Sequence, residues 1–124
     1  MPSTIRVLIA DDHRLFAEAL EAILASEPDI EVVGRARNGE EAVEQALALK
    51  PDVILMDIAM PGVDGVEATK RIRRKERDAC VLMLTGSNSR TDVARSREAG
   101  AAAYVTKDRI AAQLIEAIRE LAPG

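Results

Sequence analysis

The sequence predicts an α/β protein built on a doubly wound parallel sheet of five strands with five helices, and three observations support this. Five short apolar runs alternate with five longer segments in which apolar residues recur at helical spacing. Most of the runs lack polar alternation, as is typical of strands that are buried on both faces of a parallel sheet. Right-handed crossovers then place helices on both faces of the sheet. We expect the strand order 2-1-3-4-5.

The expected elements follow one another in regular alternation. The strands are expected at residues 5–10, 30–36, 53–57, 80–84 and 101–106. The helices are expected to begin at about residues 13, 38, 64, 89 and 108. Pro51 and Gly100 stand where the second and fourth helices should end. Nothing in this order suggests a second domain, so residues 1–124 are expected to form one domain.

Polar residues stand at the expected helix starts, where the first N–H groups need acceptors. These caps are Asp11 or Asp12, then Asn38, Asp64 and Asp108. The buried face of the first helix is expected to carry Phe16, Ala19, Leu20, Ile23 and Leu24. The fourth helix has only Val93, Ala94 and Ala99 as its main apolar residues, so we expect it to be held less firmly than its neighbours.

Composition excludes several function classes. The net charge of -4 gives no electrostatic footprint for DNA or RNA, and Phe16 and Tyr104 are the only aromatic residues. Cys80 is the only cysteine, which excludes a disulfide framework or a thiolate metal cluster. No apolar stretch approaches the roughly 20 residues of a membrane span. We therefore expect a cytoplasmic protein without a membrane or nucleic-acid partner of its own.

Four of the expected strands end on, or are followed directly by, polar residues that the packing of a buried sheet does not require. These groups are Asp11 with Asp12, Asp57, Thr85 and Lys107. With the expected strand order they meet at one edge, where three carboxylates repel one another and demand a cation. All available ligands are oxygens apart from one histidine, so the expected cation is Mg²⁺. Taken singly, either early aspartate is explained as a helix cap, Lys107 as an exposed lysine and Thr85 as a strand end.

A carboxylate flanked by a metal ion, an ammonium and a hydroxyl is an arrangement that accepts a phosphoryl group. Asp57 would be the nucleophile and would form an acyl phosphate. His13 is interpreted as a structural residue near the start of the first helix.

The same residues resemble the receiver domain of two-component response regulators, over nearly the whole chain. The resemblance rests on Asp11-Asp12, on Asp57 with Met60-Pro61 and Asp64-Gly65, on Thr85, and on Tyr104 with Lys107. Segments 10–16 and 100–108 are similar to the NarL/FixJ subgroup. The resemblance implies a flavodoxin-like fold.

The resemblance also implies roles for single residues. Asp57 would accept phosphate from the phosphohistidine of a sensor histidine kinase or phosphotransfer protein, and the chain would catalyse its own phosphorylation and dephosphorylation. Asp11, Asp12, Asp57 and the backbone carbonyl of Ala59 would bind Mg²⁺, with Asp11 acting mainly through water. Lys107 and Thr85 would hold the phosphoryl oxygens. Thr85 and Tyr104 would switch the surface of the fourth helix, fifth strand and fifth helix, and so alter self-association.

Rival interpretations remain at this point. A phosphatase of the haloacid dehalogenase type needs a second acid where this chain has Ala59. A phosphorylation-independent binding module on the same fold usually loses some acidic or lysine positions, and this chain keeps all of them. The subgroup normally carries a DNA-binding domain after the receiver, and the 124 residues show no pattern for one. This sequence is therefore expected to be either a stand-alone receiver or a piece of a longer transcription regulator. Ala59 and Ser87 occupy positions that influence the lifetime of the phosphoryl group in the family. Both side chains are small, and they do not indicate a lifetime for this chain.

Overall fold

The computed structural model describes residues 4–86 and 90–122, and the elements within these ranges alternate as expected. The strands are β1 (Ile5–Ala10), β2 (Ile30–Ala36), β3 (Val53–Asp57), β4 (Val81–Thr85) and β5 (Ala103–Thr106). The helices are α1 (Arg14–Ala25), α2 (Gly39–Leu49), α3 (Gly65–Lys75), α4 (Arg90–Ala99) and α5 (Ile110–Leu121). The five strands form one parallel sheet in the order β2-β1-β3-β4-β5, which confirms the predicted topology.

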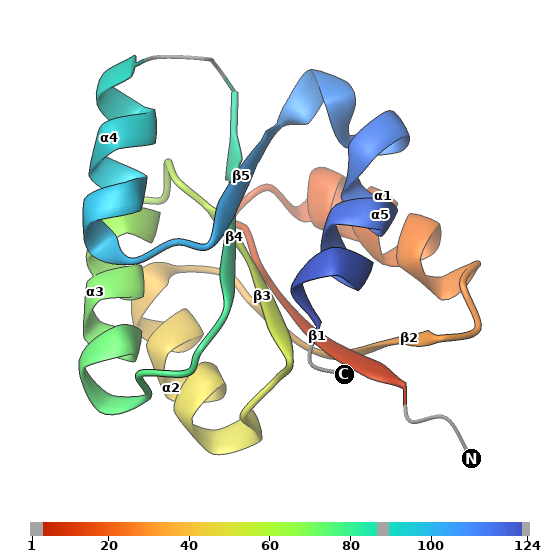
Figure 1. Ribbon diagram of the computed structural model, residues 1–124, viewed down its shortest axis with the longest axis horizontal. Helices are drawn as coiled ribbons and strands as arrows, with labels where there is room; N and C mark the ends of the chain where they lie inside the picture. The colour runs from red at the N-terminus through yellow and green to blue at the C-terminus, as the bar shows by residue number, and fades with distance from the viewer. Residues whose placement is uncertain (1–3, 87–89, 123–124) are drawn as a thin grey trace.

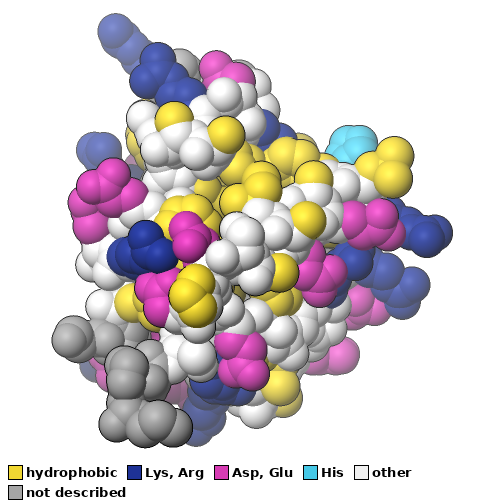
Figure 2. Space-filling view, turned by 90° about the vertical axis from the view of Figure 1, so that its right-hand side faces the viewer, with side chains coloured by type: hydrophobic (Ala, Val, Ile, Leu, Met, Phe, Trp, Pro, Cys, Tyr) yellow, Lys and Arg dark blue, Asp and Glu magenta, His cyan; other side chains and the backbone are white. Residues whose placement is uncertain are grey.

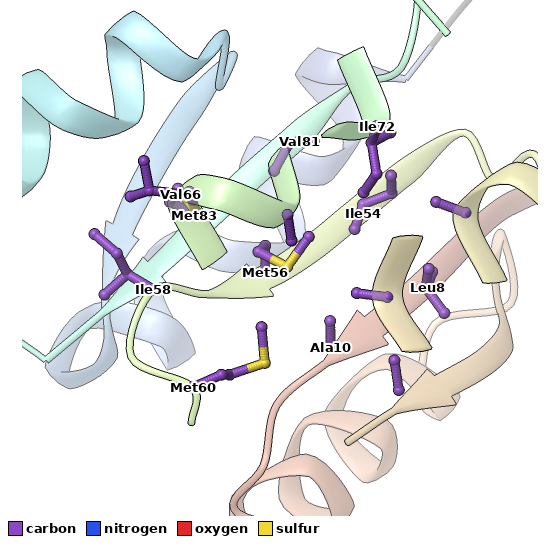
Figure 3. Packing of buried hydrophobic residues seen from close by; sticks show 14 of the residues in the cluster. Leu8, Ala10, Ile54, Met56, Ile58, Met60, Val66, Ile72, Val81 and Met83 are labelled. Atoms are coloured by element: carbon purple, nitrogen blue, oxygen red, sulfur yellow. The ribbon is translucent and has the colours of Figure 1, made fainter. Parts of the chain in front are cut away.

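The helices cover the two faces of the sheet in separate layers, with α1 and α5 on one side and α2, α3 and α4 on the other (Figure 1). Successive residues of a strand point to opposite faces, and the core divides accordingly. In β3, Ile54 and Met56 belong to the cluster under α2 and α3, shown in Figure 3, whereas Val53 and Leu55 belong to the cluster under α1 and α5. All five residues of β3 are buried, so this strand lies at the centre of both cores.

Two predicted strands begin later than expected. β4 starts at Val81, and Cys80 before it is only partly buried. β5 starts at Ala103 because Gly100, at φ +101°, still belongs to the turn that ends α4. Ser89, the expected start of the fourth helix, lies outside the described residues.

Two of the predicted helix caps are confirmed and two are wrong. The side chains of Asn38 and Asp64 accept hydrogen bonds from the backbone N–H three residues on, at 2.9 and 2.8 Å. At α1 the N-cap residue is His13, whose side chain makes no capping bond, while Asp11 accepts from the His13 backbone N–H at 2.8 Å. Asp108 caps nothing, because residues Lys107–Arg109 form a 3-10 turn that places Arg109 at the N-cap of α5.

The buried faces of two helices also differ from the predicted ones. In α1 the predicted Leu20 and Leu24 are buried, and Phe16 and Ile23 are partly buried against the same core, but Ala17 is buried in place of Ala19, which is exposed. In α4 the buried residues are Ser96 and Ala99, whereas Ala94 is exposed. The Ser96 hydroxyl is buried at little cost since it donates to the Asp92 carbonyl at 2.8 Å.

Within the described ranges, no helix combines the length and apolar character that crossing a lipid bilayer requires.

Candidate phosphoryl-acceptor site

The predicted site residues follow the carboxyl ends of four adjacent strands of the parallel sheet. Asp11 and Asp12 follow β1, Asp57 is the last residue of β3, and Thr85 is the last residue of β4. Lys107 follows β5 directly and opens the 3-10 turn. Ligands of open parallel sheets bind outside the carboxyl ends of the strands, so this edge is the expected place for chemistry.

Asp57 lies at a tightly packed strand end. The residue is 2% exposed, and its Oδ1 accepts a hydrogen bond from the Ala59 backbone N–H at 3.3 Å. The start of α3 packs directly against this strand end, because a Cβ on Gly65 would lie 2.2 Å from the Asp57 carbonyl oxygen. Only glycine at position 65 permits this approach, so α3 begins immediately beside the acidic edge.

Lys107 supplies the positive charge beside the two buried carboxylates. Its Nζ lies 3.5 Å from Asp57 Oδ1 and 3.6 Å from Asp11 Oδ2. The same Nζ lies 4.4 Å from the centroid of the Phe16 ring, which comes from α1. The ammonium is therefore surrounded by two carboxylates and one aromatic face.

The electrostatics of Asp57 reflect this crowding. Burial, followed by the negative charge of Asp11, raises the pKa of Asp57 from 3.8 to about 6. Lys107 and the Ala59 N–H act in the opposite direction but do not cancel the rise. The site therefore carries more negative charge than its one ammonium neutralises, which favours the binding of a further cation.

The acidic edge also contains an unsatisfied polar atom. The Oδ2 of Asp11 is buried and has no hydrogen-bond partner among the described residues, although Lys107 stands 3.6 Å away. Asp11, Asp12 and His13 each offer one ligand atom, and these atoms lie within 4.8 Å of one another. A buried carboxylate oxygen without a donor, next to an exposed carboxylate, fits the oxygen ligand set of a hard divalent cation.

Thr85 and Tyr104 differ in their surroundings. Thr85 is 3% exposed at the end of β4, whereas Tyr104 on β5 is 41% exposed. A surface pocket of about 280 Å³ lies beside Tyr104 and is lined by residues of α4 and of the chain leading into β5, among them Val93, Ser96 and Arg97. The tyrosine side chain thus borders open space next to the least firmly packed helix.

Sequence reasoning missed two features of this edge. It singled out Phe16 as a scarce aromatic on the first helix but did not foresee its contact with Lys107, which is 91 positions later in the sequence. It placed His13 near the start of the first helix, where the structure has it as the N-cap of α1, but it did not foresee that an imidazole nitrogen would lie within 4.8 Å of carboxylate oxygens of both early aspartates. The histidine, drawn in cyan, is exposed on the face shown in Figure 2.

Comparisons with known proteins agree with the fold and identify its family. Residues 7–119 match the family model described as the response regulator receiver domain. The chain is 46% identical over 120 residues to the transcriptional regulatory protein LiaR of Bacillus subtilis, covering 97% of this chain and 57% of that protein. The first curated relatives are matched over 51 to 58% of their length, so the chain spans little more than half of them.

Solved structures give the same result. The receiver domain of the putative response regulator NarL from Mycobacterium tuberculosis superposes with a TM-score of 0.91 at 33% identity, covering 96% of each chain. A CheX–CheY–BeF₃–Mg²⁺ complex from Borrelia burgdorferi contains a chain that superposes with a TM-score of 0.89 at 26% identity, covering 96% of this chain and 90% of that one.

Proposed function

The chain belongs to the response regulator receiver family of two-component systems, and from this premise we propose that Asp57 is its phosphoacceptor, loaded by a partner kinase in a Mg²⁺-dependent reaction. The observation that carries the proposal is a buried carboxylate at the end of the central strand with one ammonium 3.5 Å away and a second carboxylate beside it. The proposed donor is the phosphohistidine of a sensor histidine kinase or phosphotransfer protein.

The proposed reaction is an in-line displacement at phosphorus. An Asp57 oxygen forms a bond to phosphorus as the bond from phosphorus to the imidazole nitrogen breaks, and the leaving imidazole takes up a proton. At neutral pH a group whose pKa is about 6 is mostly ionised, so Asp57 is available as a nucleophile. The Lys107 ammonium, which pairs with the Asp57 carboxylate before transfer, pairs with the phosphoryl oxygens after it. The Thr85 hydroxyl donates a hydrogen bond to the same oxygens.

The proposed metal ligands are Asp11, Asp12, Asp57 and the Ala59 carbonyl. The unsatisfied Oδ2 of Asp11 and the raised pKa of Asp57 support this assignment, since both indicate surplus negative charge. When bound, Mg²⁺ supplies positive charge that offsets the spread negative charge of the transferring phosphoryl group. The chain thus promotes its own phosphorylation and later dephosphorylation without turning over an external substrate continuously.

The proposed output is a change of the surface made by α4, β5 and α5. Thr85 moves toward the phosphoryl group, and Tyr104 swings toward the space that this movement opens. The exposure of Tyr104 and the sparse packing of α4, with only Ser96 and Ala99 buried, support a two-state element there. Sizing the protein with and without beryllium fluoride and Mg²⁺ tests whether self-association changes, and identical elution would count against that part of the proposal.

We further propose that residues 1–124 form the receiver unit of a regulator whose output is transcription, exerted through a DNA-binding domain outside this sequence. The name of the LiaR relative, a transcriptional regulatory protein of which this chain matches 57%, supports this. One alternative is a receiver that acts through protein–protein contacts alone. Another is a binding module that works without phosphorylation, and the presence of Asp11, Asp57 and Lys107 together at one edge argues against it.

Intact mass spectrometry tests the proposal. The purified chain is incubated with a small-molecule phosphodonor such as acetyl phosphate, with Mg²⁺ or with a chelator. One phosphoryl adduct is expected, it should require Mg²⁺, and it should be lost in Asp57→Asn. Asp78→Asn, which removes an exposed carboxylate away from the site, should keep the adduct. A binding-only module would show no adduct, and a phosphatase would release phosphate with sustained turnover.

A further inference from the structure

The Lys107 ammonium is held near its two carboxylates without a short hydrogen bond to either. Its distances of 3.5 Å to Asp57 Oδ1 and 3.6 Å to Asp11 Oδ2 exceed the ~2.7–2.9 Å of a charge-assisted hydrogen bond. The Lys107 side chain is 24% exposed and has four rotatable carbons, so two distant carboxylates alone leave it considerable freedom. A third contact would restrict the ammonium further.

Phe16 provides that contact. The Lys107 Nζ lies 4.4 Å from the centroid of its ring, well within the ~6 Å at which a cation is attracted to an aromatic face. The ring is itself fixed, because α1 is anchored on the sheet by Ala17, Leu20 and Leu24, and Phe16 is half-buried against the same core cluster. The contact joins α1 to the turn after β5, on the side of the sheet covered by α1 and α5.

We propose that Phe16 is a positioning residue that holds the Lys107 ammonium beside Asp57, an inference that rests on the phosphoacceptor role proposed above. An aromatic face attracts a cation through its quadrupole and accepts no conventional hydrogen bond. The ring therefore brings no acceptor atom that competes for the ammonium, and the N–H donors that do not face the ring remain available for Asp11, Asp57 and the incoming phosphoryl oxygens. A carboxylate in place of the ring would hold Lys107 more strongly but would compete with the phosphoryl group for it.

The ring also lets the ammonium move without losing its support. A phosphoryl group on Asp57 places its oxygens farther from the strand end than the carboxylate oxygen that Lys107 now faces. Attraction to an aromatic face depends weakly on lateral position compared with a directed hydrogen bond. Phe16 thus stabilises Lys107 both before and after the phosphoryl transfer.

A set of variants tests this role. Phe16→Leu keeps an apolar side chain of similar reach and removes the aromatic face, and Phe16→Tyr keeps the face. Initial rates of phosphorylation by acetyl phosphate at saturating Mg²⁺ are measured by intact mass. We expect Phe16→Leu to slow the reaction about two- to fivefold, which corresponds to a cation–π contact at a partly exposed site. Phe16→Tyr should retain most of the wild-type rate.

A double-mutant cycle separates positioning from packing. In a Lys107→Met background the ammonium is absent, so Phe16→Leu should produce no further loss of rate. If Phe16 matters only for packing, Phe16→Leu would slow the reaction by the same factor with or without Lys107, and the inference would be overturned. An unchanged rate for Phe16→Leu in the wild-type background would overturn it equally.

A measurement on the unmodified protein covers the case in which Phe16→Leu fails to fold. The ε-methylene protons of Lys107 should show an upfield ring-current shift in a ¹H–¹³C spectrum, with Lys50, Lys70 and Lys75 as internal references. A Lys107 resonance that coincides with the other three would overturn the inference. A wild-type chain that accepts no phosphoryl group would instead overturn the proposed function, and the two failures are therefore distinguishable.

Discussion

Replacing Asp57 with asparagine should stabilise the metal-free protein at neutral pH, because it removes a charge that the folded state holds at a cost. Raising a pKa from 3.8 to about 6 corresponds to about 3 kcal/mol, since each pKa unit is worth about 1.4 kcal/mol. This net shift already includes the opposing attraction of Lys107, and the neutral amide must still be accommodated in the buried strand end, which reduces the gain. We expect Asp57→Asn to raise the free energy of unfolding by about 1–3 kcal/mol at pH 7.5.

The same pKa fixes the pH dependence of the gain. Below pH 3.8 the Asp57 carboxyl is protonated in both states and contributes no difference. Between about pH 4 and pH 6 the unfolded chain has lost this proton while the folded chain keeps it, so the wild type loses stability relative to Asp57→Asn as pH rises. Above about pH 6 the difference is constant.

Urea unfolding followed by circular dichroism at pH 5 and pH 7.5, with a chelator present, measures both quantities. Asp78→Asn serves as the matched control, since the Asp78 side chain is exposed, and it should change little at either pH. A destabilised Asp57→Asn protein, or a gain equal at the two pH values, would refute the reasoning that burial and Asp11 penalise the charged form.

Three further predictions concern the elements that position the site. Gly65→Ala should destabilise the fold by about 1–3 kcal/mol, because its Cβ would meet the Asp57 carbonyl oxygen at 2.2 Å. Gly86→Ala, whose Cβ would meet no atom of the described residues within 4 Å, should change stability by no more than about 0.5 kcal/mol, and equal urea midpoints for the two variants would contradict this. Asn38→Ala should cost about 1 kcal/mol through loss of its cap on α2, and His13→Ala, at a helix start without a side-chain cap bond, should cost less by the same assay. Backbone amides of α4 should exchange with deuterium faster than those of α3, which buries five residues where α4 buries two, and slower exchange in α4 would contradict the weak packing inferred for it.

The strand pattern could be predicted because uninterrupted apolar runs in a short chain leave few alternatives to a buried parallel sheet. Asp57, Thr85 and Lys107 could be placed at one edge for the same reason, since a doubly wound sheet brings its strand ends together. Asn38 and Asp64 were predicted correctly as caps because each stands immediately before an uninterrupted helical pattern.

The remaining features depend on tertiary detail that a single sequence does not carry. The choice of Ala17 over Ala19 for the buried face depends on how α1 is rotated against the sheet, and both residues are alanines. The 3-10 turn at Lys107–Arg109 replaced the expected cap at Asp108, because local propensity does not distinguish a tight turn from a first helical turn. The contact between Phe16 and Lys107 joins segments that are adjacent only in the folded chain.

Chemical localisation of the modified residue tests the central claim most directly. The chain is phosphorylated with acetyl phosphate and Mg²⁺, reduced with borohydride, which converts an acyl phosphate into an alcohol, and digested for peptide mapping. We predict that the reduced carboxyl is found at Asp57 and that it is absent when Mg²⁺ is chelated. Reduction at Asp11, Asp12 or an exposed acid, with Asp57 unchanged, would contradict the account.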